Sequence, residues 1–182
     1  MMLGIVKWLE STALHQFFLD HYGTFLPVIQ AIHVLGVGVV VVSIFMIVLR
    51  ILNRAGRDLT LTETVGRYRP WIWGGLVLLL ATGMLMIFTE PGREFLDPGQ
   101  PSSPEKEYWN WAFWIKMGLL LIGIAVAATF QSSLRRNQER WEKSLAVQTR
   151  IRALAVLTLI GWLVILILGR LIAYPGVLYG AA

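Results

Sequence analysis

The sequence predicts an all-α integral membrane protein, in which a bundle of four transmembrane helices follows an interfacial amphipathic helix at the N-terminus. Hydrophobic residues make up 56% of the 182 residues and charged residues only 15%, whereas a soluble domain carries about 25% charged residues. Four stretches have the roughly 20 apolar residues that are needed to cross the hydrocarbon core. Because backbone groups in lipid must be satisfied internally, each stretch is expected to be a helix.

Residues 1–22 are predicted to form the amphipathic helix. Apolar residues recur there at helical spacing, and polar residues such as Lys7 and Glu10 fall largely on the other side. Such a helix lies in the plane of the membrane surface. Gly23 and Pro27 are then expected to turn the chain into the transmembrane domain, residues 23–182.

The predicted spans cover residues 25–49, 70–88, 111–130 and 153–173. The segments 50–69 and 132–152 hold eleven of the 16 Lys and Arg residues, while acidic residues prevail in the proline-rich segment between the second and third spans. The positive-inside rule therefore predicts a multi-pass protein of the bacterial inner membrane, with both termini in the periplasm. Since these basic residues flank the predicted spans and are explained by the topology, nucleic acid is not an expected partner. The expected partners are the lipid bilayer and a second copy of the chain or a membrane redox protein.

Three ionisable residues, His33, Lys116 and Arg170, lie within the spans. Such residues are costly in a bilayer and are functional hypotheses by default. By the predicted topology, all three lie in the outer half of the membrane. No carboxylate lies in any span, and no Ser–His–Asp spacing stands out, so hydrolytic catalysis has little support.

Small and polar residues share one side of each predicted helix. The first helix carries Gln30, His33, Gly36, Val40 and Ser43, the second carries Gly75, Thr82 and Met86, the third carries Lys116, Gly123, Ala127 and Gln131, and the fourth carries Thr158, Gly161, Gly169 and Arg170. These sides are expected to meet in the interior of the bundle, where small residues permit close packing. The Trp residues that open the second span, Trp71 and Trp73, are interpreted as interfacial anchors.

This pattern favours a haem-b-like redox or electron-transfer component. His33 would provide the axial ligand to the iron, and Lys116 and Arg170 would pair with the propionates. Gln30 shares the side of His33, and Met86 is a candidate second ligand.

Alternatives remain open at this stage. Met84 or Met117 would serve in place of Met86, and a five-coordinate haem or a haem shared across a dimer needs neither. The same cations suit a non-enzymatic binding or accessory subunit that holds lipid, a small anion or a partner helix. Copper held by His33 and methionines is a further candidate, and simple helix packing and snorkelling explain the same residues without any ligand.

Several short motifs carry a resemblance to a known family. The chain contains Ile-His-Val-Leu-Gly at residues 32–36, Pro-Trp-Ile-Trp-Gly at 70–74, Phe113 followed by Lys116, and Gly-Arg-Leu-Ile-Ala-Tyr at 169–174. Together these resemble a family of small bacterial inner-membrane proteins classed as a domain of unknown function. That family is distantly similar to the membrane domain of copper resistance protein D and its haem-b-binding relatives. The resemblance implies four helices and a site at His33, Lys116 and Arg170.

Overall fold

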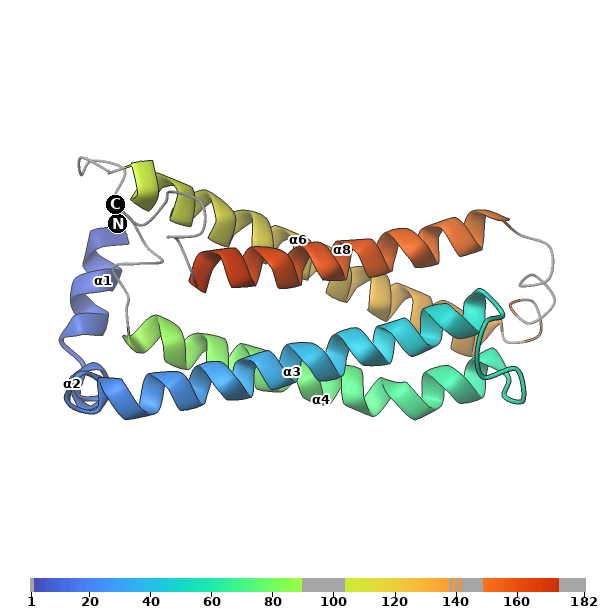
Figure 1. Cartoon of the computed structure of the whole chain (residues 1–182), viewed down its shortest axis with the longest axis horizontal. Helices are drawn as coiled ribbons and strands as arrows, with labels where there is room; N and C mark the ends of the chain where they lie inside the picture. Colours follow the sequence, from blue (N-terminus) through green and yellow to red (C-terminus); the bar gives the residue numbers. More distant parts are fainter. Residues whose placement is uncertain (1, 90–103, 138, 140, 142–148, 174–182) are drawn as a thin grey trace. The chain divides into compact units, whose positions relative to one another are not determined.

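The computed structural model describes residues 2–89, 104–137, 139, 141 and 149–173, and these form helices and short connections without any strand (Figure 1). The helices are α1 (Met2–Glu10), α2 (Ala13–Asp20), α3 (Tyr22–Ile51), α4 (Leu61–Thr89), α6 (Pro104–Arg136) and α8 (Thr149–Ala173). Four of them, α3, α4, α6 and α8, are long and apolar enough to cross a membrane. The prediction of an all-α protein with four transmembrane helices is therefore confirmed.

The long helices begin and end beyond most of the predicted span boundaries. α3 starts at Tyr22 and contains Pro27, so this proline does not separate two elements as expected. α4 starts nine residues before Pro70 and continues through it. Each proline lacks a backbone N–H and so removes one hydrogen bond from its helix, yet both helices continue through it. The spans were underestimated because polar turns extend helices past the hydrocarbon region.

The N-terminal segment forms two helices where one was expected. Thr12 separates them: its hydroxyl accepts a hydrogen bond from the backbone N–H of His15 at 3.2 Å and so caps the start of α2. The hydroxyls of Ser11 and Thr12 donate to the carbonyl groups of Trp8 and Leu9, at the end of α1. These local hydrogen bonds compete with a continuous helix.

The connection between α3 and α4 is held by polar contacts. Arg50 Nε donates to the Leu59 carbonyl at 2.6 Å. Thr60 and Glu63 form a capping box, in which the Glu63 carboxylate accepts from the Thr60 backbone N–H at 2.7 Å and the Thr60 hydroxyl accepts from the Glu63 N–H at 3.1 Å. α4 therefore has a defined start at Leu61.

The chain divides into two compact units. The first comprises Met1–Gly36, Val77–Met117 and Ile167–Ala182, and the second comprises Val37–Leu76 and Gly118–Leu166. Each long helix contributes one part to each unit. Most of the charged residues of the segments around 50–69 and 132–152 fall in the second unit, whereas His33, Lys116 and Arg170 all fall in the first.

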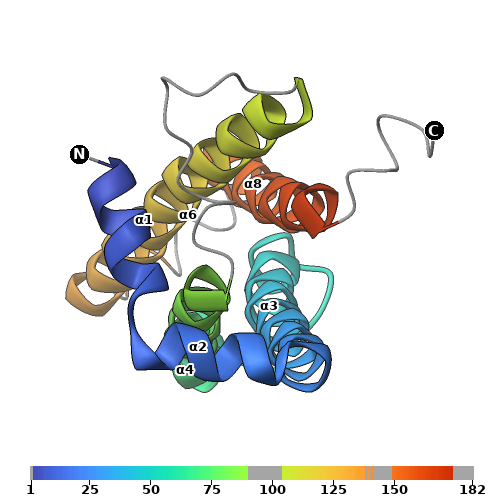
Figure 2. The same cartoon turned by 90° about the vertical axis from the view of Figure 1, so that its left-hand side faces the viewer.

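In the first unit, the N-terminal helices lie against the end of α4. His15 is buried, and its Nδ1 donates to the Phe88 carbonyl at 2.7 Å. Figure 2 shows α2 beside this end of α4. Ala112 and Phe113 of α6 form a small buried cluster with Ile87 and Met117. These contacts join α2 and α6 to the end of α4.

In the second unit, residues of the predicted inward sides of α3, α4 and α6 are buried. Val40 and Ser43 of α3, Gly75 of α4 and Gln131 of α6 are each less than one tenth exposed. The outward residues, such as Leu121 of α6, remain exposed as lipid-facing residues would be. On α8 the prediction fails: Thr158 and Gly161 are only half-buried, and the buried residues of this helix are Ala155, Trp162 and Ile165.

Candidate functional site

The candidate site in the first unit is centred on His33, in the first half of α3. His33 is half-buried, and its Nδ1 lies 2.7 Å from Oγ1 of Thr82 on α4. Its Cε1 lies 3.8 Å from the position that a Cβ would take on Gly83. Gly36, one turn further along α3, packs closely against Leu78 and Leu79. The imidazole is thus held against α4 by a hydrogen bond and by the absence of a side chain at Gly83.

The hydrogen bonds around Thr82 determine which ring nitrogen of His33 carries the proton. The Thr82 hydroxyl donates its single proton to the Leu78 carbonyl at 2.7 Å. The hydroxyl oxygen therefore offers only lone pairs to the imidazole, so Nδ1 is the donor in the pair. In the neutral ring, Nε2 then carries the free lone pair. His33 is consequently oriented as a base or a ligand through Nε2.

Lys116 of α6 extends to α8 beside Gly169. Its Cε and Nζ lie 3.8 Å from the position that a Cβ would take on Gly169. The lysine side chain therefore extends toward α8 at the point where that helix has no side chain. A larger residue at position 169 would compete with the lysine tip for this space.

The other predicted site residues lie around this arrangement with different degrees of burial. Arg170 follows Gly169 directly and is exposed. Gln30 is half-buried one turn before His33, and its side chain forms no hydrogen bond within the described residues. Met86 is half-buried one turn after Thr82, on the same side of α4. The structure thus pairs His33 with Thr82, places Lys116 beside Gly169, and places Gln30 and Met86 on the helix sides of His33 and Thr82.

The remaining methionines are poorly placed as ligands. Met84 is 59% exposed on α4, and Met117 packs against the Ala112–Phe113 cluster. Within the described residues, no group of three or more His, Asp or Glu side chains gathers in the manner of a metal site. Copper held by His33 with several methionines is therefore not supported by the arrangement of the side chains.

Two polar features of the second unit were not expected from the sequence. Trp73 Nε1 donates to Oε1 of Gln131 at 3.0 Å, so this tryptophan links α4 to α6, whereas Trp71 is exposed as an interfacial anchor would be. Trp162 of α8 packs its indole edge on Gly123 of α6, and its Nε1 finds no hydrogen-bond partner within the described part of the chain. The small residue Gly123 was a signal for the second contact, but nothing in the sequence paired Trp73 with Gln131.

Comparisons with known proteins leave the family open. No family model matches the chain, and neither a curated protein nor a solved structure matches it. The functional argument therefore depends on the geometry of the site.

Proposed function

We propose that the protein is a redox or electron-transfer component of the bacterial inner membrane that holds a haem b through His33. The observation that carries this proposal is the hydrogen-bond chain from His33 Nδ1 through the Thr82 hydroxyl to the Leu78 carbonyl. Metal-ligating histidines characteristically donate their second ring nitrogen to a fixed acceptor, which sets the tautomer and the ring orientation. Thr82 fulfils this role for His33.

The residues around His33 fit a haem by their chemistry. The Nε2 lone pair of His33 supplies the axial ligand, and the half-buried Met86 is the thioether best placed to supply a second one. Lys116 and Arg170 provide cations for the two propionates. When bound, haem b would supply a one-electron carrier. The role of the chain is to ligate the iron, to orient the imidazole and to neutralise the carboxylates.

A visible absorption spectrum of the purified protein tests this proposal. The protein is produced in cells supplied with a haem precursor, and its haem content is measured after extraction. We expect a Soret band that disappears in His33→Ala and persists in His21→Ala, because His21 is an exposed histidine outside the site. A wild-type protein that contains no haem despite ample supply would refute the proposal.

The second candidate function is a non-enzymatic binding or accessory subunit. It is favoured by the position of the Lys116 ammonium beside Gly169, the residue that precedes the cationic Arg170 in the sequence. Lys and Arg side chains suit a phosphate or carboxylate group. Mass spectrometry of the purified protein separates the two functions. A colourless protein that retains an anionic lipid, and loses it in Lys116→Gln, supports this second function.

A further inference from the structure

The Trp73–Gln131 pair of the second unit leaves hydrogen-bond donors without partners. Trp73 N–H is only a donor, so the oxygen of the Gln131 amide must face it, and the amide nitrogen points elsewhere. Gln131 is 7% exposed, and its Nε2 forms no hydrogen bond within the described residues. Gln131 Nε2 is not among the fully buried side-chain atoms without a partner in the described residues, so its N–H groups remain accessible. They can donate to a ligand that brings an acceptor oxygen.

Two arginines lie one helical turn beyond this pair. Arg69 precedes Trp73 by four residues on α4, and Arg135 follows Gln131 by four residues on α6. Residues four apart share a side of a helix, about 6 Å apart along its axis. The start of α4 and the end of α6 are their basic ends. Measured from the Trp73–Gln131 pair, Arg69 and Arg135 both lie toward these basic ends. Both are exposed, and their guanidinium groups are accessible to a ligand.

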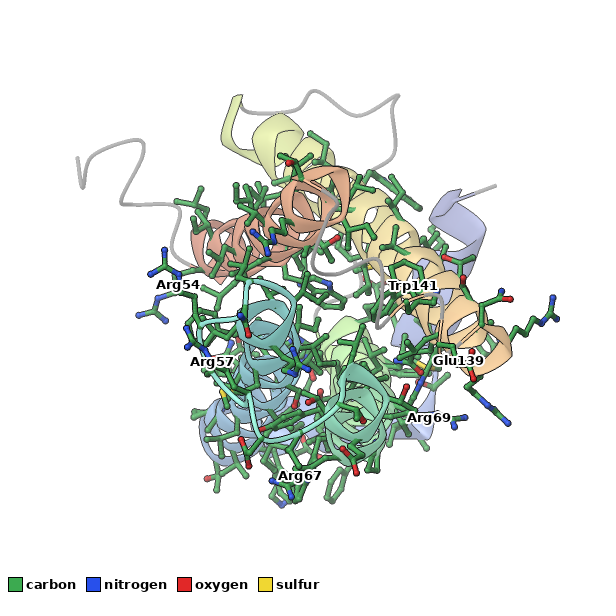
Figure 3. The ribbon with its side chains drawn as sticks, turned by 90° about the vertical axis from the view of Figure 1, so that its right-hand side faces the viewer. Arg54, Arg57, Arg67, Arg69, Glu139 and Trp141 are labelled. Atoms are coloured by element: carbon green, nitrogen blue, oxygen red, sulfur yellow. The ribbon has the colours of Figure 1, made fainter. Side chains whose placement is uncertain are left out.

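The charge of this end of the unit is strongly positive. Exposed arginines occur at positions 54, 57, 67, 69, 135, 136 and 152, against the exposed acids Asp58, Glu63 and Glu139. Figure 3 shows that Arg54 and Arg57 lie on one side of this end, and that Arg69 lies on another side near Glu139 and Trp141. The long helices that end here are long and apolar enough to cross a membrane. In a membrane, the anions next to such basic helix ends are the headgroups of phospholipids.

We infer that Arg69, Arg135 and Gln131 form a binding site for the phosphodiester group of an anionic phospholipid, such as phosphatidylglycerol. The arginines bind the phosphate oxygens, since the guanidinium fork matches phosphate geometry. The Gln131 amide donates to a phosphate or ester oxygen, while Trp73 fixes its orientation. This site is independent of the proposed function, because its residues belong to the second unit and those of the haem proposal belong to the first.

Native mass spectrometry of the full chain tests this inference. The protein is purified in detergent and mixed with equal amounts of phosphatidylglycerol and phosphatidylcholine that carry the same acyl chains. We expect the wild-type protein to retain phosphatidylglycerol preferentially. The double variant Arg69→Gln/Arg135→Gln should lower this retention about tenfold. Arg54→Gln/Arg67→Gln, which removes the same charge from the same end, should lower it less than about twofold.

Three outcomes would overturn the inference. They are equal retention of both lipids by the wild-type protein, equal losses in the two double variants, and no loss in either. Gln131→Glu provides a second measurement if the arginine variant does not fold. It keeps an oxygen for the Trp73 N–H but replaces the amide donor with an anion, and it should abolish the preference for phosphatidylglycerol. Unchanged preference in Gln131→Glu would likewise refute the site.

Discussion

His33 and Thr82 form a hydrogen bond of 2.7 Å between two transmembrane helices, and the threonine hydroxyl donates a hydrogen bond to the Leu78 carbonyl. The consecutive helices α3 and α4 are thereby joined through one hydroxyl group. The same bond fixes the imidazole with Nε2 as its free nitrogen. The stability of the first unit and the ligand properties of His33 therefore depend on the same contact.

Replacing Thr82 with valine tests this contact. Valine keeps the shape of the side chain but cannot accept from His33, so we expect a loss of about 1 kcal/mol of stability. If haem is bound, its retention should also fall. Thr82→Ser keeps the hydroxyl and serves as the control. Thermal unfolding in detergent and the haem-to-protein ratio measure the two effects, and equal behaviour of Val and Ser would contradict the role of the hydroxyl.

Gly123 is predicted to be intolerant of a side chain. A Cβ at this position would lie 3.1 Å from Cζ2 of Trp162, a ring that is 3% exposed and therefore has little room to move. Gly123→Ala should cost about 1–3 kcal/mol by overpacking. Gly118→Ala on the same helix meets nothing within 4 Å and should be neutral or slightly stabilising. The comparison of their unfolding temperatures decides the point, and similar temperatures would refute the close contact.

Trp73 is expected to be more important for stability than Trp71. Trp73→Phe keeps an aromatic ring but removes the N–H that donates to Gln131, and should cost about 1–2 kcal/mol. Trp71 is 61% exposed, so Trp71→Phe should change stability by less than about 0.5 kcal/mol. Chemical unfolding in mixed micelles measures both values. A larger effect at Trp71 would show that anchoring outweighs the link between the helices.

His15 is expected to hold the N-terminal helices in place. Its Nδ1 donates to the Phe88 carbonyl across 73 positions of sequence, and the side chain is buried. His15→Ala should release α1 and α2, and hydrogen exchange of their backbone amides should become faster by about tenfold. His21 is exposed and bonds only within its own turn, so His21→Ala is the matched control. Unchanged exchange in His15→Ala would refute the anchoring role.

The sequence predicted the membrane helices and their inward sides more completely than the contacts between them. Helical spacing identified Gly36, Val40 and Ser43 as one buried side, because glycine and hydroxyl residues are tolerated where helices approach closely. Spacing within one helix cannot pair residues of two helices, so neither the His33–Thr82 bond nor the Trp73–Gln131 bond was predicted. Both depend on the relative rotation and shift of two helices, which packing of the whole chain determines.

The N-terminal segment illustrates a different limit. Apolar periodicity continued across Ser11 and Thr12, so the pattern predicted one helix over residues 1–22. The interruption arises from two hydroxyl groups that bond to the nearest carbonyl groups and to the N–H of His15. Such local competition leaves no trace in hydrophobicity, and only the residue types at a helix cap indicate it.

The hydrogen-bond chain at His33 also restricts where a proton can travel. It ends on the carbonyl oxygen of Leu78. A backbone carbonyl carries no proton that it could donate, and it is not basic enough to accept one. A proton that reached the imidazole would have to leave from Nε2, on the side by which it arrived. The hydrogen bonds through Thr82 therefore cannot conduct a proton, and the imidazole exchanges no proton with α4 in the first unit.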